Sequence, residues 1–379
     1  MKSTLFRAGA AFAAAGLLLA VAACSSPSPA PAPADGGDGE AADDVTVTAG
    51  WVSAIDQIGL PAALDQGFFE EAGLDVEIAE PFATGVDQLN ALETDQIQFA
   101  QVGAPYIGAK LSGADYVLVG NYTGSASQFG IDETMAVVAR DGSGVAEGDL
   151  ATLEGKKIGV AVGSINHLYL LAVLEDLGLP SDSVEIVNTA PPDLGVALQT
   201  GGIDVAIVWD PWPLQILEQV EGSYEVARGG GYIGYLGYIV TKRAFAEENP
   251  DVVERFLTAR AAADQWMREN PSEAAGVAAR WLSSLDPAIA QAAMEFNIKQ
   301  LDPRISACNY AALDAAQTTL HELGSIDGTF DVNEAFLPGP MTNVLASSPE
   351  LFDDLSAIPG SAQIGDGFAF DPAGGQCPR

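Results

Sequence analysis

The stretch from Lys156 to Trp212 constrains the fold more than any other part of the chain. Short runs rich in Val and Ile alternate in it with segments whose leucines recur at helical spacing. Such runs are typical of strands buried in a parallel sheet, so the alternation predicts a β-α-β-α-β unit of an open α/β protein. The predicted strands are residues 158–162, 184–188 and 205–209, and the predicted helices are residues 168–177 and 194–198.

The turn between the first strand and the first helix of this unit predicts an anion site. Gly163, Ser164, Ile165 and Asn166 lie where the strand ends and the helix begins. The first N–H groups of a helix have no acceptor within the helix, and the positive end of the helix dipole lies at the same place. A helix start of this kind binds an oxyanion without a charged side chain.

Length and charge limit the classes of function. The chain has 379 residues and is 48% hydrophobic, which is enough for a large core divided between two lobes. It has 52 acidic and 16 basic residues, a net charge of -36. A nucleic acid as partner is therefore excluded, because no basic surface can replace its counterions. We interpret the acidity as a solvated surface rather than as an acidic binding face.

The first 44 residues have the order of an export signal, an anchor and a tether. A basic start precedes an apolar run at residues 8–23, which ends in Val-Ala-Ala-Cys24. This order predicts a secretory signal peptide over residues 1–23, and its ending resembles a bacterial lipobox that lipidates Cys24. A plain transmembrane helix fits less well, because the run has only about sixteen residues. Residues 24–44 predict a disordered Pro/Gly/acidic tether, so we expect a lipid-anchored protein on the outer face of the cytoplasmic membrane.

Four segments carry a family resemblance. IGLPAALDQGFFEEAGLDVEI (residues 58–78) and DQLNALETDQIQFAQVGAP (residues 87–105) are similar to the first lobe of the substrate-binding proteins of taurine, sulfonate and nitrate ABC importers. GSINHLYLL (residues 163–171) resembles the Gly-Ser-Thr-x-His-Tyr segment of taurine-type binders, and residues 185–211 resemble the segment that follows it. The resemblance covers about residues 45–300.

This resemblance implies the fold and the partners. The family fold is a two-lobed clamp of the type II periplasmic-binding class, with an open, mostly parallel sheet flanked by helices in each lobe. Lobe I is then residues 45–134 and 237–379, and lobe II is residues 135–236. We expect residues 134–140 and 237–241 to be paired hinge strands. The implied protein is a monomer that passes a small anion or zwitterion to an ABC permease and needs no cofactor.

A ligand in such a clamp lies between the lobes, against loops at the carboxyl ends of the strands. We expect the backbone N–H groups of residues 164–167, with the side chains of Ser164 and Asn166, to hold a sulfonate or a similar oxyanion. Asp210 is expected to pair with an ammonium group, which favours taurine, although a cap on the turn at Pro211 is an equal alternative. The predicted ligand-binding residues are Trp51, Gln101, Gly103, Ser164, Ile165, Asn166, His167, Trp209, Asp210 and Tyr232.

Several of these assignments have alternatives. His167 packs in the first turn of the helix as readily as it contacts a ligand, and Trp212 fits the core as well as the wall of the site. Tyr232 and Tyr235 lie in a glycine-rich run that lines the cleft or marks a hinge. The sequence departs from the family at Asn166 and Asp210, both near the expected ligand.

Catalytic functions find little support. The chain has two histidines and lacks the GxSxG, phosphate-loop and GxGxxG patterns. We therefore expect neither an enzyme nor a metal site. Two alternatives to sulfonate transport stay open on the same fold. One is a binder of a thiamine-pathway pyrimidine or another small solute, and the other is a sensory solute receptor.

Cys308 and Cys377 form an even pair once Cys24 is lipidated, and an oxidising location favours a disulfide between them. The alternative is two unpaired, buried thiols.

We expect reduction of the chain to lower its free energy of unfolding by about 4 kcal/mol, because the bond closes a loop of about 70 residues in the unfolded state. Urea unfolding with and without a reductant measures the effect. A Cys308→Ser/Cys377→Ser variant is the control and should not respond to the reductant. An unchanged molecular mass after reduction would contradict the bond.

Overall fold

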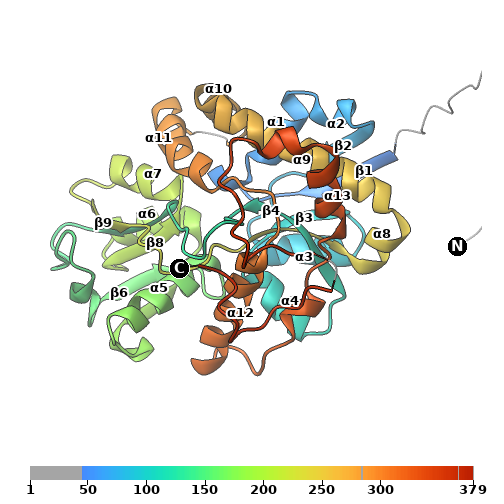
Figure 1. Cartoon of the computed structure of the whole chain (residues 1–379). Coiled ribbons are helices and arrows are strands. Elements are labelled where there is room, and N and C mark those ends of the chain that lie inside the picture. The colour runs from blue at the N-terminus through green and yellow to red at the C-terminus, as the bar shows by residue number, and fades with distance from the viewer. Residues whose placement is uncertain (1–44, 283–284, 366, 379) are drawn as a thin grey trace, which may run out of the picture. The chain divides into compact units, whose positions relative to one another are not determined.

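The computed structural model describes residues 45–282, 285–365 and 367–378. The predicted signal peptide, the lipidated Cys24 and the tether lie outside these residues. The described strands form two five-stranded sheets (Figure 1). The first sheet contains β1 (Val45–Gly50), β2 (Leu74–Ile78), β3 (Phe99–Val102), β4 (Tyr116–Thr123) and β10 (Gly237–Lys242). The second contains β5 (Met135–Ala139), β6 (Lys157–Val160), β7 (Glu185–Asn188), β8 (Val205–Trp209) and β9 (Tyr224–Arg228).

The two sheets have the same construction. Their strand orders are β2-β1-β3-β10-β4 and β7-β6-β8-β5-β9. In each sheet the first two pairings in this order are parallel and the last two are antiparallel. The α/β class predicted from the sequence is confirmed. Each sheet is mixed, because one strand, β10 in the first sheet and β5 in the second, runs against the other four.

Strands β5 and β10, which lie where the chain passes from one sheet to the other, do not pair with each other. β5 lies between β8 and β9 in the second sheet, and β10 lies between β3 and β4 in the first. The prediction of paired hinge strands over residues 134–140 and 237–241 is therefore wrong. Both runs are apolar for a different reason, since each strand is buried within its own sheet.

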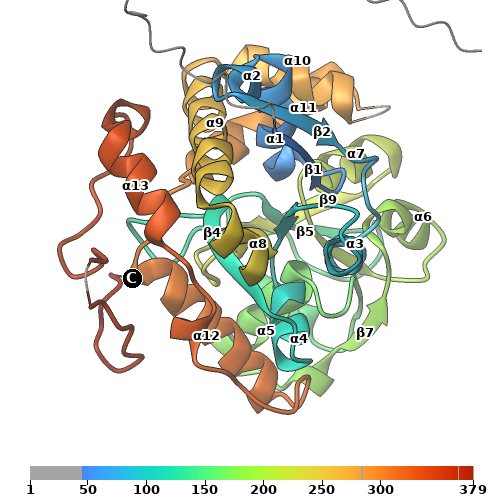
Figure 2. The same ribbon diagram turned by 90° about the vertical axis from the view of Figure 1, so that its right-hand side faces the viewer.

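Helices cover both sheets (Figures 1 and 2). The α-helices are α1 (Gly59–Asp65), α2 (Phe68–Glu71), α3 (Gly85–Glu93), α4 (Pro105–Leu111), α5 (Ile165–Asp176), α6 (Leu194–Gln199), α7 (Trp212–Gln219), α8 (Arg243–Glu248), α9 (Pro250–Glu269), α10 (Pro271–Trp281), α11 (Pro287–Asn297), α12 (Ala307–Glu322) and α13 (Gly339–Ser347). Short 3-10 turns are η1 (Ile55–Gln57), η2 (Leu150–Leu153), η3 (Ser181–Ser183), η4 (Pro191–Asp193), η5 (Ile298–Gln300), η6 (Val332–Glu334) and η7 (Pro349–Phe352). α9 packs on α1, α2 and α13 over the first sheet, while α5, α6 and α7 pack on the second.

The packing of β8 on both of its faces explains why its sequence is apolar without alternation. Val205 and Ile207 lie in the large core that also contains the apolar side chains of α5. Ala206 and Val208 face the other way, into a smaller core with residues of α6 and α7. Successive strand residues point to opposite faces, so a strand covered on both faces needs apolar residues throughout.

Local sequence signals set several helix ends. Pro105 begins α4, where the missing N–H has no cost. α3 begins with a capping box, in which the Thr84 side chain accepts from Asp87 N and the Asp87 carboxylate accepts from Thr84 N. A break at Asn249 separates two helices, because the residue before a proline disfavours helical geometry: α8 ends at Glu248 and α9 begins at Pro250.

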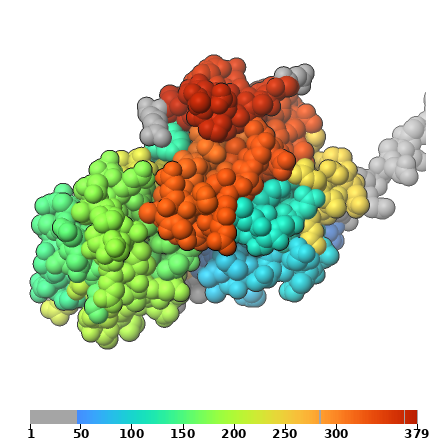
Figure 3. Space-filling view, turned by 90° about the horizontal axis from the view of Figure 1, so that it is seen from below, coloured from blue at the N-terminus to red at the C-terminus, as the bar shows by residue number. Residues whose placement is uncertain are grey.

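Helix α12 joins the C-terminal part of the chain to both sheets. It packs on α5 of the second sheet, and Figure 3 shows its orange surface between the green and the cyan surfaces of the chain. A disulfide joins Cys308 at its first turn to Cys377 near the C-terminus. The sequence analysis did not predict this helix. Its start is nevertheless marked by a capping box of Ser306 and Asn309.

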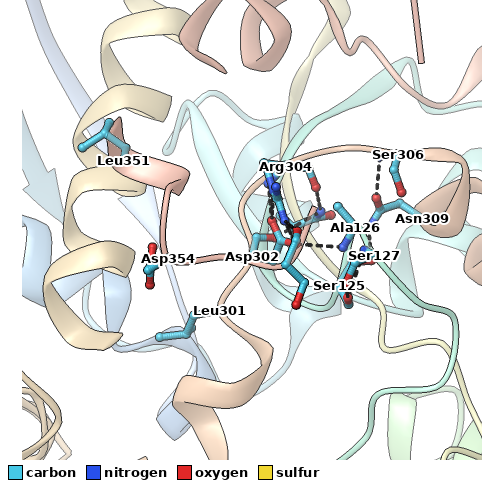
Figure 4. A network of polar contacts seen from close by, with 12 residues as sticks. Ser125, Ala126, Ser127, Leu301, Asp302, Arg304, Ser306, Asn309, Leu351 and Asp354 are labelled. Atoms are coloured by element: carbon cyan, nitrogen blue, oxygen red, sulfur yellow. Dashed lines mark hydrogen bonds and ion pairs between the residues drawn. The ribbon is translucent and has the colours of Figure 1, made fainter. Parts of the chain in front are cut away.

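A buried ion pair holds the segment before α12 (Figure 4). The Arg304 guanidinium donates to both carboxylate oxygens of Asp302, at 2.8 and 2.9 Å. The same carboxylate accepts from Ala126 N at 3.0 Å, and Arg304 also donates to Ser356 O at 2.8 Å. The pair therefore fastens three segments that are far apart in the sequence.

Replacing Asp302 by Ala should lower the free energy of unfolding by about 3–5 kcal/mol, because the Arg304 charge stays buried without its partner. Urea denaturation measures the loss. Asp115→Ala is the matched control, since it breaks an exposed pair with Arg243 and should cost at most about 1 kcal/mol. Equal losses of unfolding free energy in the two variants would show that the buried pair contributes no more to stability than the exposed pair does.

Candidate functional site

A cavity of about 180 Å³ lies where strands of both sheets end. From the first sheet it is lined by the segments after β1 and β3 and by the start of α3. From the second sheet it is lined by the segments after β6 and β7 and by Trp209, the last residue of β8. The lining residues are Val52, Ala54, Asp56, Gln57, Ala83, Thr84, Gly85, Val86, Gln101, Val102, Gly103, Ala104, Pro105, Tyr122, Ala161, Val162, Gly163, Ser164, Ile165, Pro191, Trp209, Tyr235 and Leu236.

The start of α5 supplies hydrogen-bond donors on the second-sheet side. Ser164 is the residue before the helix, and its side chain does not cap the helix. Its hydroxyl instead donates to Ala161 O at 2.6 Å. Among the described residues, the N–H of Ile165 has no acceptor, and this residue lines the cavity. The positive end of the α5 dipole therefore lies at the cavity with an unused donor.

The Trp209 indole adds a second donor on the same side. Trp209 ends β8 and lines the cavity. Its Nε1 is buried and donates to no acceptor among the described residues. A buried indole N–H normally has a hydrogen-bond partner, so this donor is suited to a ligand acceptor.

Asp56 supplies a carboxylate on the first-sheet side. It lies in η1 and is only 4% exposed. Its Oδ2 accepts from the Tyr235 hydroxyl at 2.9 Å, whereas its Oδ1 accepts no hydrogen bond within the described residues. Burial raises the pKa of the Asp56 carboxyl to about 6, and the hydrogen bond from Tyr235 opposes this with a smaller lowering.

Three buried glutamines fix the loops beside Asp56. The Gln57 side chain accepts from Val52 N at 2.7 Å and donates to Gln101 O at 3.1 Å. The Gln88 side chain accepts from Gln101 N at 3.0 Å and donates to Gln101 O at 2.8 Å. Gln101 Oε1 itself has no partner among the described residues. The first-sheet side of the cavity therefore presents unused acceptors on a rigid frame.

The lining contains no Lys, Arg or His side chain, and Asp56 is its one carboxylate. An anion in this cavity has backbone and indole N–H groups as its donors, not a cationic side chain. The absence of a cation is the main electrostatic property of the site.

The structure brings five of the ten predicted ligand residues together in this cavity. They are Gln101, Gly103, Ser164, Ile165 and Trp209. Gly103 makes a close backbone contact, because a Cβ at this position would lie 2.4 Å from Leu236 O. A side chain at residue 103 is therefore excluded by the chain that returns to β10.

Trp51 and Asn166 lie beneath the cavity surface rather than on it. The Trp51 indole donates to Ala79 O at 3.0 Å and packs edge-on against Trp281, with 5.9 Å between ring centroids. Asn166 is fully buried, and its amide donates to Ile207 O at 3.0 Å. Both side chains hold loops of the site in place, and neither lines it. Trp212 packs against the smaller core of the second sheet.

Asp210 is occupied by an internal partner. It is fully buried, and its Oδ2 accepts from Arg228 at 2.6 Å. Arg228 in turn lies over the Phe296 ring, 4.2 Å from the centroid. Burial raises the pKa of Asp210 to about 7, although Arg228 acts in the opposite direction. The expected pairing of Asp210 with a ligand ammonium is not supported by this position.

His167 and Tyr232 also lie away from the cavity. His167 Nδ1 accepts from Gly163 N at 3.2 Å, so the ring closes the turn before α5. It faces a separate surface depression with Leu171 and Leu323. Tyr232 lies at a surface groove beside α12 and packs edge-on against Tyr169.

Tyr122 and the start of α3 also line the cavity and were not predicted to do so. Asp56 was not among the predicted ligand-binding residues either, although a carboxylate between Ile55 and Ile58 was the available signal. Tyr235 was one of two tyrosines in the glycine-rich run, and the structure places it, rather than Tyr232, at the cavity.

No helix within residues 45–282, 285–365 and 367–378 has the length and apolar character that a membrane span requires. Among the same residues, no group of three or more His, Cys, Asp or Glu side chains is placed to hold a metal ion.

Comparisons with known proteins identify relatives. A sequence model of the family described as NMT1/THI5 like matches residues 54–274, more than half of the chain. A protein of Bacillus subtilis (strain 168) named for binding aliphatic sulfonates is 30% identical over 219 residues, which cover 56% of this chain and 63% of that protein. The match thus spans less than two thirds of that relative.

Two further relatives differ in the ligand they are named for. The taurine-binding periplasmic protein of Escherichia coli (strain K12) is 27% identical over 238 residues, 61% of this chain and 69% of that protein. The formylaminopyrimidine-binding protein of Halalkalibacterium halodurans is 25% identical over 245 residues, 63% and 71% of the two chains.

Solved structures share the fold. The alkanesulfonate-binding protein SsuA from Xanthomonas axonopodis pv. citri, bound to MOPS, has a TM-score of 0.67 at 22% identity, and the match covers 78% of this chain and 99% of that one. The desulfurization enzyme DSZB has a TM-score of 0.59 at 17% identity, covering 80% and 99%. These two likenesses concern the fold alone, and the fold also supports an enzyme.

The raised pKa of Asp56 predicts a pH dependence of stability in the ligand-free chain. Between its ordinary value of 3.8 and about 6, the folded state keeps a proton that the unfolded state has lost. This contribution to stability is complete at low pH and is lost as the pH rises through the window.

Between pH 4 and pH 6 the free energy of unfolding should therefore fall less in Asp56→Asn than in the wild type, by on the order of 2 kcal/mol. Urea denaturation over a pH series measures the difference. Asp182→Asn removes a carboxylate from an exposed position and is the control. Parallel pH profiles for Asp56→Asn and the wild type would contradict the buried, raised carboxyl.

Proposed function

Because the chain belongs to the NMT1/THI5-like family, we propose that it is the extracytoplasmic solute-binding lipoprotein of an ABC importer. It binds a small sulfonate-type anion or zwitterion between two lobes and presents it to a permease. Cys24 anchors it to the outer face of the cytoplasmic membrane. The relatives named for aliphatic sulfonates and taurine support this ligand class.

The observation that carries the proposal is the unused N–H of Ile165 at the start of α5. Ile165 is among the residues of a cavity that both sheets line, and Trp209 lines it on the same side. An oxyanion placed there would accept hydrogen bonds from both donors and interact favourably with the helix dipole. Taurine, with a sulfonate at one end, has the size and charge for such a cavity.

Residues 45–134 with 237–379 and residues 135–236 are the proposed lobes. A ligand that contacts both lobes favours a closed arrangement over an open one, because the closed arrangement makes both sets of contacts at once. One lobe–lobe contact beside the cavity is already present, since Ile55 N donates to Asp210 O at 3.3 Å.

The relative named for formylaminopyrimidine favours a second candidate, a pyrimidine of the thiamine pathway. The unused acceptors on the first-sheet side are compatible with an amino group on such a ring. A sensory receptor for the same solute would use the same cavity with a different membrane partner.

Ile165→Pro tests the oxyanion site, because it deletes one N–H at the first helical position, where proline is tolerated. Ser164 is already extended, with φ -97° and ψ 179°, as the residue before a proline must be. We expect Ile165→Pro to weaken binding of an alkanesulfonate by about 10-fold to 100-fold in calorimetric titration.

Ile165→Ala is the control, since it removes the same side chain and keeps the N–H. It should bind alkanesulfonate more tightly than Ile165→Pro does. Equal affinities in the two variants would remove α5 from the anion site. No binding of taurine, an alkanesulfonate or nitrate to the wild type would contradict the proposed ligand class.

A further inference from the structure

We propose that Asp56 recognises a positively charged nitrogen at one end of the ligand, so that the cavity selects a solute with both an oxyanion and an ammonium group over a plain anion. This inference rests on the proposed function and adds the second half of its binding site. It also gives the ligand a direction across the cavity, with the oxyanion at α5 and the nitrogen at η1.

Unused hydrogen-bond donors and unused acceptors belong to residues on opposite sides of the cavity. The second-sheet side offers the unused donors of Ile165 and Trp209. The first-sheet side offers the unused acceptors of Asp56 and Gln101. A ligand that fills the cavity without leaving these groups unpaired has acceptors at one end and donors at the other.

The Asp56 carboxylate is held in one position beside the cavity. Its neighbours Ile55 and Ile58 are fully buried in the core, so the η1 backbone is held on both sides. The Tyr235 hydroxyl fixes Oδ2, and the hydrogen bonds of the adjacent Gln57 fix the start of the loop. Oδ1 is thus a fixed acceptor in a residue that lines the cavity.

The described residues that line the cavity supply no counter-charge for Asp56. Arg228 pairs with Asp210 and Glu225, and the fully buried Arg260 pairs with Asp264. Neither arginine is among the lining residues, which include no other cation. A buried carboxylate without a cationic partner is costly, and a ligand ammonium would remove that cost on binding. A ligand that is only an anion would instead add a like charge near Asp56.

The test is calorimetric titration of the full chain with taurine and with ethanesulfonate, which has the sulfonate without the amine. The wild type should bind taurine about tenfold or more tightly than ethanesulfonate. Asp56→Asn should lose most of this preference and keep its affinity for ethanesulfonate. Asp182→Asn is the matched control, since it makes the same substitution at an exposed residue outside the lining, and it should retain the preference. Thermal unfolding of each variant verifies that it is folded.

The other possible results of the titration distinguish a failure of the role of Asp56 from a failure of the proposed function. If the wild type binds both sulfonates equally, or if Asp56→Asn weakens both equally, the role of Asp56 is overturned while the proposed function stands. If the wild type binds neither sulfonate, the proposed ligand class fails, and a 4-aminopyrimidine becomes the probe for the role of Asp56. Loss of its binding in Asp56→Asn would support recognition of a nitrogen donor by Asp56, and unchanged binding would overturn it.

Discussion

Parallel strands place all their carboxyl ends at one edge of a sheet, and this constraint positions the site. In this chain the constraint acts twice. β1 and β3 in the first sheet and β6 and β7 in the second are followed by segments that line the same cavity, and β8 contributes its last residue, Trp209. The antiparallel strands β10 and β5 occupy equivalent places in the two sheets and do not end at the cavity in this way. Strand direction therefore brings together most of the loops that line the cavity, although they are far apart in the sequence.

The chemistry of the cavity depends on the polar groups that the surrounding hydrogen bonds leave unpaired. Ser164, Asn166 and His167 all carry polar groups near the anion site, and all three use them to hold the turn or the helix. What they leave is a backbone N–H, which is held more rigidly than a side chain would be. A fixed donor loses little conformational entropy when a ligand binds. The same holds for the acceptor side, where three glutamines brace the loops beside Asp56.

The amino-acid pattern predicted well which strands are buried, but it predicted poorly which strands and which charged side chains pair with one another. The run at residues 205–209 was predicted to be a strand, and β8 has those bounds, because a strand covered on both faces leaves a continuous apolar signal. The same signal at β5 and β10 says only that they are buried, so their supposed pairing was wrong. Asp210 shows the limit for charges. Its partner Arg228 belongs to another strand, and no local spacing indicates that the two side chains meet at 2.6 Å. Asp56 was hidden for the converse reason, since an isolated carboxylate in an apolar loop gives no periodic signal.

The close approach at Gly103 also limits how the site can change during evolution. The Leu236 carbonyl occupies the space of any side chain at residue 103, so glycine is the one residue that fits there. A change of ligand choice would then need substitutions at other lining residues, such as 56, 101 and 209. Such substitutions would leave the contact between residues 103 and 236, and the pairing of β3 with β10 beside it, as they are.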